Sequence, residues 1–444
     1  MKKTIGIIGP YSDTSGTGTF VRFLARGLAF DENYNVIVFS FNDPWQATEE
    51  DANIKIFEFG QLTAENIWQF GEFIAENSLA ENVDLIAPQC KPELAVAGLV
   101  AKSRLAEKGK SVPLCGNWHS NFGWIKDAPY HLAHAKMGIV HMDSILPVSM
   151  NVQENITEIL GSEMERRIVP SGGVDVEKIR AYETDRNVFK EQCDPNKFIL
   201  FYVGRMLYNK GLDILAKALA ILKDDDIHAV LVGKGPFLEP FSDAAKENDV
   251  AHQMTFTGFM PDETVYSMLR SADSFVLPSR WESFNISALE GMAAGLPVVA
   301  TRVGGLPFWV GDSALLVEPE SPEAFAAGIK KMKEDAAYRK EMAQKAYDLA
   351  PKYHWRNIAV ETAKEYADLF GKEGSPAPDI SGNELAIDLN GDQLTFQRDG
   401  FVTEKNTDGE KKYIITRYGL FHPSEALENE AEKVQDPEAL YYQT

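Results

Sequence analysis

The most constraining feature of this sequence is an alternation of short apolar runs with amphipathic helical stretches, which starts twice along the chain. Strand–helix alternation predicts a parallel sheet covered by helices on both faces. We therefore expect an α/β fold with two such domains. The length of 444 residues supports two domains, because it exceeds what one ordinary hydrophobic core sustains.

The first 170 residues contain the first set of predicted strands. The charged start precedes an apolar run of only five residues and then Pro10, which favours a buried strand over a signal peptide. A helix is predicted over 18–29, where Phe20, Phe23, Leu24 and Leu28 share one face. The predicted strands are 5–9, 36–41, 54–59, 84–87, 112–116, 144–148 and 168–169.

The pattern restarts after residue 175, and the segment 170–175 is predicted to be a hinge. A helix is predicted over 213–222, and another over 355–370 closes the region. The predicted strands of this second domain are 198–203, 228–232, 254–257, 274–277, 297–300 and 315–317.

The C-terminal segment has a different character. Gly374-Ser375-Pro376-Ala377-Pro378 is typical of a linker, and short strands with turns at 390–391 and 399–400 are predicted after it. Residues 371–444 carry 15 acidic and 7 basic side chains. The sequence therefore predicts a linker and acidic tail over 373–444, which form a separable, β-rich appendage to which no function is assigned.

Composition excludes several classes of protein. The net charge of −22 opposes binding to nucleic acid or to anionic lipid, so we expect neither, and we expect a soluble acceptor. No run reaches the roughly 20 apolar residues of a membrane helix, so no transmembrane segment is expected. Three widely spaced cysteines fit neither a disulfide framework nor a zinc site, which favours a reducing, cytoplasmic location.

Two cations follow the first strand of the second domain. Arg205 and Lys210 lie five positions apart after Val203-Gly204, and the carboxyl ends of parallel strands are where such sheets bind ligands. Together these cations can neutralise a diphosphate. Taken alone, the segment is equally compatible with two solvated surface cations.

A second group follows a later strand. Glu282 lies in a loop, a helix is predicted to begin near Ile286, and Glu290 lies one turn into that helix. The first-turn amides around Asn285 and Ile286 are suited to an anion such as a phosphate. Glu290 could bind ribose hydroxyls and Glu282 could project toward a sugar. Either carboxylate alone would be ascribed to a loop or to a helix-surface ion pair.

The run from Glu282 to Thr301, with seven residues between its two glutamates, resembles the signature of family 4 retaining glycosyltransferases. The segment 204–211 resembles the same family's donor-phosphate motif. The segments 232–236, 257–259 and 304–307 match in order and position. The resemblance is strong over about 198–320 and looser to residue 370.

The resemblance implies the GT-B fold, in which two Rossmann-like domains face a cleft. It implies an N-terminal acceptor domain over 1–172, a donor domain over 173–352 and a helix over 353–372 that returns to the N-terminal domain. Nucleotide-sugar, UDP- or GDP-linked, is the implied donor, and transfer of a hexose with retention is the implied reaction. The implied donor-binding residues are Arg205, Lys210, Gly233, Phe259, Phe284, Asn285, Ile286 and Glu290, with Glu282 at the reacting sugar.

Two N-terminal features fit this picture. Ser15-Gly16-Thr17-Gly18 follows the first strand and opens a helix, so Gly16 could face the donor phosphates, although Val21 replaces the third glycine of a dinucleotide fingerprint. His119 resembles a histidine that the family places near the reacting sugar. A histidine at a strand end is otherwise more often structural.

Three positions depart from the family pattern and loosen any inference about which sugar is moved. Phe308 replaces a glutamate, the hinge reads Pro170-Ser171-Gly172-Gly173, and Ser283-Phe284-Asn285 replaces Gly-Phe-Gly. No metal and no other cofactor is expected, because Arg205 and Lys210 can take the cation's role. The Asp224-Asp225-Asp226 run is predicted to lie in a turn at the sheet edge away from the ligand.

Two rival functions remain open at this point. A nucleotide-sugar 2-epimerase would also use two Rossmann-like domains but would need no acceptor. A non-catalytic protein that binds sugar nucleotides could use the acidic tail as a partner surface, and the four residues Arg205, Lys210, Glu282 and Glu290 argue against it.

Overall fold

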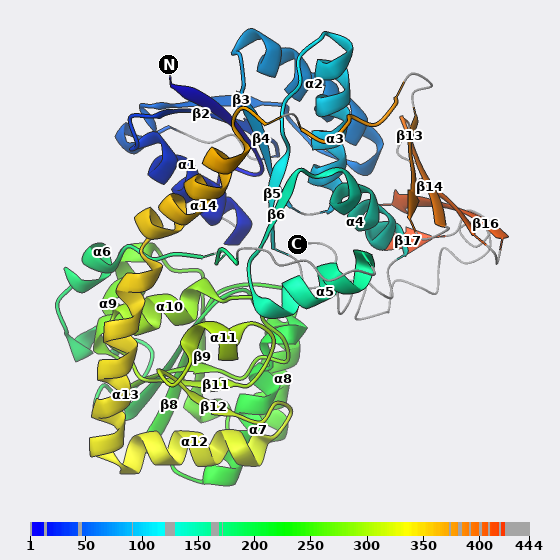
Figure 1. The fold of residues 1–444 in the computed structure, drawn as a ribbon. Coiled ribbons are helices and arrows are strands. Elements are labelled where there is room, and N and C mark those ends of the chain that lie inside the picture. The colour runs from blue at the N-terminus through cyan, green and yellow to red at the C-terminus, as the bar shows by residue number, and fades with distance from the viewer. Residues whose placement is uncertain are drawn as a thin grey trace. The chain divides into compact units, whose positions relative to one another are not determined.

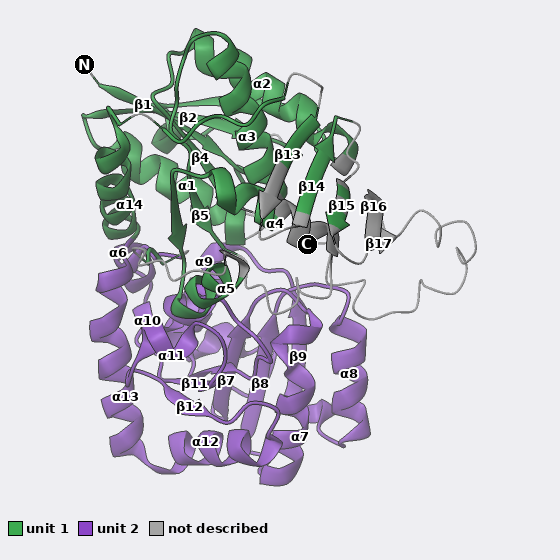
Figure 2. Cartoon of the chain, turned by 45° about the vertical axis from the view of Figure 1, so that its right-hand side comes forward, with its two compact units in different colours: residues 1–171, 355–444 green, residues 172–354 purple. Residues whose placement is uncertain are grey.

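The computed structural model divides the chain into two compact units, one of residues 1–171 with 355–444 and one of residues 172–354 (Figures 1 and 2). Each unit is described by itself. The residues described are 2–12, 16–42, 47–90, 92–119, 129–160, 168–170, 172–372, 374–380, 384–389, 392–398, 402–406, 409–416 and 419–421.

The first unit is built on a six-stranded sheet in the order β3-β2-β1-β4-β5-β6. All of its strand pairs are parallel, and β1, with the sequence Lys-Thr-Ile-Gly-Ile-Ile, is buried along most of its length, as a strand covered on both faces requires. The strands are β1 (Lys3–Ile8), β2 (Tyr34–Ser40), β3 (Ile54–Glu58), β4 (Leu85–Cys90), β5 (Cys115–Trp118) and β6 (Ser144–Pro147).

Helices flank this sheet in two groups, with α1 and α14 on one side of the strands and α2, α3 and α4 on the other (Figure 1). The α1–α14 pair is close because Gly27 faces Ala359, where a Cβ on the glycine would lie 2.5 Å from that of the alanine. The rings of Phe23 and Trp355 stack at 4.5 Å across the same pair. The helices are α1 (Gly16–Ala29), α2 (Ile67–Ala80), α3 (Pro92–Glu107), α4 (Pro129–His141), α5 (Met150–Leu160) and α14 (Trp355–Leu369), with 3₁₀ turns at Glu49–Asp51 and Ala64–Asn66.

The second unit has its own six-stranded sheet in the order β12-β11-β10-β7-β8-β9. Its strand pairs are all parallel, and every residue of β8 and β10 is buried. The strands are β7 (Phe198–Val203), β8 (Ile227–Val232), β9 (Met254–Gly258), β10 (Ser274–Leu277), β11 (Val298–Thr301) and β12 (Leu315–Val317).

The helices of the second unit alternate with these strands along the chain, which is the doubly wound pattern that the sequence predicts (Figure 2). They are α6 (Val176–Arg180), α7 (Leu212–Leu222), α8 (Leu238–Glu247), α9 (Asp262–Ser271), α10 (Ile286–Ala293), α11 (Leu306–Val310), α12 (Pro322–Glu334) and α13 (Ala336–Leu349), with 3₁₀ turns at Arg186–Phe189, Tyr208–Lys210, Ala251–Gln253 and Ala350–Tyr353. The predicted fold class, two α/β domains of Rossmann type, is confirmed.

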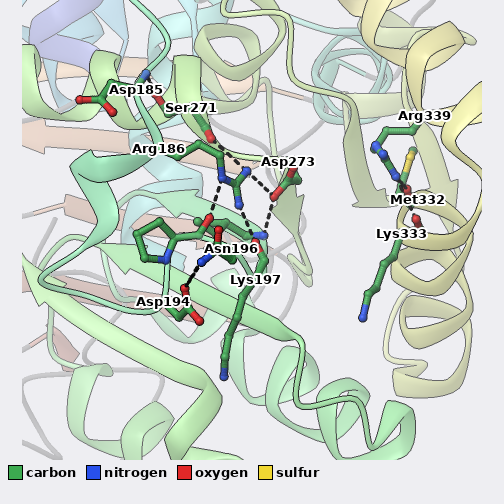
Figure 3. Close-up of polar contacts among 12 residues, drawn as sticks. Asp185, Arg186, Asp194, Asn196, Lys197, Ser271, Asp273, Met332, Lys333 and Arg339 are labelled. Atoms are coloured by element: carbon green, nitrogen blue, oxygen red, sulfur yellow. Dashed lines mark hydrogen bonds and ion pairs between the residues drawn. The ribbon is translucent and has the colours of Figure 1, made fainter.

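The strand-start edge of this second sheet is held by Arg186, whose guanidinium donates to the Pro195 carbonyl at 2.7 Å and to Asp273 at 2.8 Å (Figure 3). It also donates to the Lys197 carbonyl at 2.5 Å. Asp273 accepts the Ile199 amide at 2.8 Å, so the starts of β7 and β10 share one carboxylate. On the neighbouring helices, Arg339 donates to the carbonyls at the end of α12 (Figure 3).

A third, antiparallel sheet follows α14, so the prediction of β-structure after residue 373 is confirmed for the described residues. Its order is β13-β14-β15-β16-β17. The strands are β13 (Glu384–Leu389), β14 (Asp392–Gln397), β15 (Val402–Asn406), β16 (Gly409–Thr416) and β17 (Gly419–Phe421). The predicted turns at 390–391 and 399–400 lie outside the described residues.

The segment 374–378, which was predicted to be a linker, makes several bonds to the first unit. Ser375 accepts from the Lys102 ammonium at 3.0 Å, and its backbone amide and hydroxyl both donate to Asp143. The Ser103 hydroxyl donates to the Pro378 carbonyl at 2.8 Å. The segment is therefore bonded to α3 and to the residue that precedes β6.

The strands beyond it are equally bound to the first unit. Leu385, Leu394 and Phe396 are completely buried and belong to the same apolar core as α2 and α3. The Phe396 ring stacks 6.3 Å from that of Trp68. These residues are part of the first unit's core, which contradicts a separable appendage.

Two predicted strands differ from the observed ones. The run 112–116 is a strand only from Cys115, and 168–169 forms no strand. Val169 does donate its amide to the Pro147 carbonyl at 3.0 Å, directly beyond β6, but one bond does not make a strand. The hinge residue Ser171 lies outside the described residues.

Candidate functional site

The carboxyl ends of β7, β8, β9 and β10 meet at one edge of the second unit's sheet, and most of the predicted site residues follow them. Backbones approach closely here. A Cβ on Gly233 would lie 1.8 Å from the Gly204 carbonyl oxygen, and the φ of Gly233 is 140°. A Cβ on Gly211, with φ 63°, would lie 2.1 Å from the Pro278 carbonyl oxygen. Glycine is therefore required at both positions by geometry.

The two predicted cations differ in their surroundings. Arg205 is exposed, and its guanidinium makes no hydrogen bond or ion pair within the described part of the chain. Lys210 is held in the 3₁₀ turn after β7, where its ammonium donates to Oε1 of Glu282 at 2.8 Å. An ammonium has three N–H donors, so two of them remain for another acceptor.

Glu282, which was predicted to project from its loop toward a sugar, is buried, with 4% of its surface exposed. Its Oε1 accepts from three donors: Lys210 Nζ at 2.8 Å, Ser279 Oγ at 2.7 Å and Asn285 Nδ2 at 2.9 Å. Its Oε2 accepts no hydrogen bond from the described residues, and it is not sealed from solvent. The carboxylate therefore has one anchored oxygen and one oxygen with free accepting capacity.

The backbone around Glu282 is also fixed from a neighbouring loop. The Gly305 amide donates to the Glu282 carbonyl at 3.0 Å. A Cβ on Gly304, the residue before it, would lie 1.8 Å from the same oxygen. The backbone of the Gly304-Gly305 turn after β11 thus packs directly against the loop that carries Glu282.

Asn285 is the N-cap of α10, and its Oδ1 accepts the Ala288 amide at 2.8 Å. The helix begins at Ile286, as predicted. The φ of Asn285 is 83° with ψ 92°, a conformation that a non-glycine residue rarely adopts. Because the cap satisfies only one of the first amides, those of Ile286 and the residue after it keep no helical partner.

The side chain of Phe284, a predicted donor-binding residue, packs inside the second unit. Its ring is buried and stacks on Trp309 at 4.7 Å, and the Trp309 indole donates to the Phe284 carbonyl at 2.6 Å. The side chain is therefore part of the second unit's core.

Glu290 lies one turn into α10 and is not bonded to the Lys210–Glu282 pair. The pKa of Glu290 is raised to about 8, chiefly by burial and also by the nearby Asp262, while a hydrogen bond with Tyr266 and the charge of Lys178 act in the opposite direction. The carboxyl group is therefore largely protonated at pH 7 in the absence of ligand.

Phe259 and Gly233 lie at the neighbouring strand ends. Phe259 directly follows β9 and its side chain is 71% exposed. The Gly233 amide donates to the Gly258 carbonyl at 2.8 Å, which ties the ends of β8 and β9 together. An exposed aromatic ring beside a rigid backbone edge can stack on a flat ligand.

Gly16 and His119 belong to the first unit. Gly16 begins α1 and is exposed, with open space where a Cβ would lie, and Ser15 is outside the described residues. His119 follows β5, and its Nε2 lies 3.3 Å from the Gln89 side-chain oxygen. Its ring meets the Phe20 ring edge-on at 4.7 Å. Burial lowers the pKa of His119 to about 3, so the ring is neutral at pH 7.

Ser279 lies three positions before Glu282, outside the run from Glu282 to Thr301, and was not predicted to be a site residue. It is completely buried, accepts the Thr301 hydroxyl at its carbonyl and donates its own hydroxyl to Glu282. The next residue, Arg280, forms a two-pronged pair with Asp213 of α7 at 2.8 Å on both prongs. A polar residue directly after a buried strand was the available signal for Ser279.

Acidic groups away from this edge have local explanations. Among the described residues, Asp175, Glu177 and His354 are close enough together to suggest a metal site. Asp175 already caps α6 and accepts the Lys178 amide at 2.9 Å, and Glu177 pairs with His354 at 3.2 Å. The run 224–226 lies in the turn before β8, as predicted, where Asp224 pairs with Lys333 at 2.6 Å.

The chain is similar to known glycosyltransferases in sequence. Residues 183–349 match the family described as "Glycosyl transferases group 1". An uncharacterized glycosyltransferase of Methanocaldococcus jannaschii is 32% identical over 236 residues, which cover 50% of this chain and 59% of that protein. The D-inositol 3-phosphate glycosyltransferase of Corynebacterium glutamicum is 31% identical over 251 residues, which cover 52% of this chain and 59% of that protein. The chain thus spans 59% of the length of these two relatives.

Solved structures show the same fold. The sucrose-phosphate synthase of Thermosynechococcus elongatus has a TM-score of 0.69 at 21% identity and covers 83% of this chain and 99% of that one. Anabaena HepE, solved in complex with UDP, has a TM-score of 0.68 at 19% identity and covers 83% of this chain and 100% of that one. These likenesses confirm the predicted GT-B fold, while membership of family 4 stays a prediction. Within the described residues, no helix is long and apolar enough to cross a membrane.

Proposed function

Because the chain carries a group 1 glycosyl transferase domain over residues 183–349 and has the GT-B fold, we propose that it transfers a sugar from a nucleoside-diphosphate sugar to an acceptor. The proposed donor is a UDP- or GDP-linked hexose, and the UDP complex of HepE, a protein of the same fold, supports the choice of UDP as a first probe. The proposed stereochemical course is retention.

One observation carries the proposal: the Lys210–Glu282 pair, in which Glu282 is buried, and an Arg205 that has no partner among the described residues occur at the same strand-end edge as the start of α10. The two cations and the first amides of the helix suit the two phosphates of a nucleoside diphosphate. The free Oε2 of Glu282 suits a sugar hydroxyl. One edge therefore offers partners for both parts of a nucleotide-sugar.

The same groups suit the chemistry. When the bond between the sugar and the diphosphate breaks, negative charge grows on the departing phosphate and positive charge on the sugar. Arg205, Lys210 and the amides of α10 would stabilise the first, and the Glu282 carboxylate would favour the second. The acceptor hydroxyl then bonds to the sugar carbon and gives up its proton to the oxygen of the departing diphosphate. Attack on the face that the diphosphate leaves gives retention without a covalent enzyme intermediate.

No metal is required in this proposal, because Arg205 and Lys210 supply the positive charge that a divalent cation would otherwise bring to the diphosphate. Turnover in the presence of EDTA should equal turnover in magnesium. Loss of activity in EDTA with recovery on adding magnesium or manganese would refute this part of the proposal. The acceptor is proposed to be soluble, since the net charge of −22 disfavours anionic membranes.

The donor site is tested by substitution and nucleotide binding. A thermal-shift screen of UDP-, GDP- and ADP-sugars first selects the donor. Lys210→Ala then removes a charge-assisted bond to the diphosphate, worth roughly 1.5–3 kcal/mol. Affinity for the nucleoside diphosphate should fall about 10- to 150-fold by calorimetry. Arg205→Ala should behave in the same way.

Lys345→Ala is the matched control, because Lys345 pairs with Asp312 and Glu341 on the surface of α13 and follows no strand end. It should bind nucleotide as the parent does. Parent-like affinity in both Lys210→Ala and Arg205→Ala would refute the donor site. A requirement for a second substrate separates transfer from epimerisation, in which an altered sugar appears without any acceptor.

A further inference from the structure

We propose that Ser279 and Asn285 are positioning residues that hold one oxygen of the Glu282 carboxylate, so that the other oxygen faces the donor sugar. The inference rests on the proposed function and adds to it the roles of two side chains that do not themselves touch substrate. The inference is based on a difference between the two carboxylate oxygens of Glu282. Oε1 accepts three hydrogen bonds, and Oε2 accepts none from the described residues.

The three donors come from three different segments of the second unit. Lys210 follows β7, Ser279 follows β10, and Asn285 is the N-cap of α10. Donors that approach from three directions fix both the position and the rotation of the carboxylate. Glu282 could otherwise turn its side chain and exchange the two oxygens at little cost.

The two neutral donors matter because Lys210 has a second partner in the proposed reaction. When a diphosphate binds, the ammonium is shared between the phosphate oxygens and Glu282. The hydroxyl of Ser279, at 2.7 Å, and the amide of Asn285, at 2.9 Å, have no such competing role. They keep Oε1 in place throughout the transfer while the Lys210 contact changes.

Each of the two residues is itself held firmly. Ser279 is completely buried and its carbonyl accepts from Thr301. Asn285 uses its Oδ1 to cap α10 and its Nδ2 to reach Glu282, so its amide group has one fixed orientation. Its φ of 83° is a conformation that favours glycine, so the side chain is kept there against a backbone cost.

Asn285 allows a test that separates positioning from helix capping. Asn285→Asp keeps the oxygen that caps α10 but replaces the amide donor with a second carboxylate that repels Glu282. Asn285→Gly suits the backbone conformation but removes both bonds. A residue that only capped the helix would give a parent-like Asp variant and an impaired Gly variant. A positioning residue instead gives a lower kcat in the Asp variant than in the Gly variant.

The experiment measures kcat and KM with UDP-glucose, the affinity for UDP by calorimetry, and the melting temperature. For Ser279→Ala and Asn285→Gly, kcat should fall about tenfold, because each loses a hydrogen bond to a charged group that acts at the reacting sugar. For Asn285→Asp, kcat should fall further. The affinity for UDP should stay within about threefold of the parent in all three, since none of these side chains meets the nucleotide.

Ser321→Gly is the control for capping, because Ser321 caps α12 through the Ala324 amide at 3.1 Å and stands outside the proposed machinery. It should lower the melting temperature and leave kcat unchanged. A parent-like kcat in Asn285→Asp would overturn the inference, as would a fall in kcat that only follows a fall in UDP affinity. Failure of the proposed function would instead appear in the parent, as an absence of binding to UDP, GDP and their sugars.

Discussion

The two edges of the second unit's sheet use charged residues in opposite ways. At the strand-start edge, Arg186 donates to Pro195, Lys197 and Asp273, and Asp273 is also bonded to the backbone of β7 (Figure 3). At the strand-end edge, Arg205 has no partner within the described part of the chain, and Glu282 uses only one of its oxygens.

The difference teaches how to tell structural polar groups from candidate functional ones in the same sheet. A charged group whose donors or acceptors are all used inside the protein has nothing left for a ligand, and its removal should cost stability. A charged group that keeps unused capacity at a rigid edge should cost binding or turnover when it is removed. Three predictions sharpen or break this distinction.

The largest loss of stability should come from breaking the buried Lys102–Asp143 pair of the first unit. This pair tests whether fully partnered charges are also structural outside the second unit's sheet. Their side chains are 2% and 6% exposed, and they lie 2.7 Å apart. Lys102→Ala leaves a buried carboxylate without its cation, which should destabilise the fold by about 3–5 kcal/mol. Urea unfolding measures this, and UDP affinity of the folded protein should not change.

The same substitution tests the C-terminal segment, because Lys102 also donates to Ser375. Limited proteolysis should cut Lys102→Ala near residue 375 faster than the parent. Ser375→Ala is the milder matched variant, since it removes the hydroxyl and keeps the ion pair. Parent-like stability in Lys102→Ala would show that fully partnered buried charge is not the structural marker we infer.

The second prediction sets the two arginines of the second unit against each other. Arg186→Ala should destabilise the protein by roughly 1.5–3 kcal/mol and leave UDP affinity unchanged, because it removes bonds to a charged partner and to carbonyls. Arg205→Ala should instead lower the affinity for UDP and leave the free energy of unfolding unchanged. The comparison breaks if both variants lose stability equally in urea or if both lose UDP affinity equally in calorimetry.

Much of the fold followed from the sequence, because its signals are local. Apolar runs bounded by glycine and proline marked the strands of both parallel sheets, and the start of α10 at Ile286 was predicted from the residues beside it. The bonds that the predicted linker at 374–378 makes could not be predicted, because its partners are remote in the sequence. Ser375 bonds to Asp143, 232 positions earlier, and no local pattern announces that pairing.

The candidate site shows the same limit. Sequence motifs placed Arg205, Lys210 and Glu282 at one edge, but they could not show that Glu282 is buried or that only one of its oxygens is used. Those properties depend on Lys210, 72 positions away, and on a serine that no motif singled out. The motif also could not show that the Phe284 ring is buried, because its stacking partner Trp309 lies in α11, beyond the end of the motif.

The smallest effects concern Glu290, which is half-buried in α10, the helix that begins after β10 at the strand-end edge. Its folded-state pKa of about 8 is above the ordinary value of 4.5, so the folded protein binds a proton that the unfolded chain has lost. Its stabilising contribution is therefore full below about pH 4.5 and is lost as the pH rises through 8. The free energy of unfolding of the parent, minus that of Glu290→Gln, should fall by about 1 kcal/mol or more between pH 5.5 and 7.5.

Nucleotide binding should move the same proton if Glu290 binds ribose hydroxyls. Hydroxyl donors stabilise the charged carboxylate, so they oppose the burial and the nearby Asp262 that raise its pKa. UDP binding at pH 7 should then release a fraction of a proton, measured by calorimetry in two buffers with different ionisation enthalpies. Glu290→Gln is the control, because any proton that remains comes from the phosphates or from other groups. Equal proton release in the parent and in Glu290→Gln would show that Glu290 keeps its proton when UDP binds, as a purely structural buried acid does.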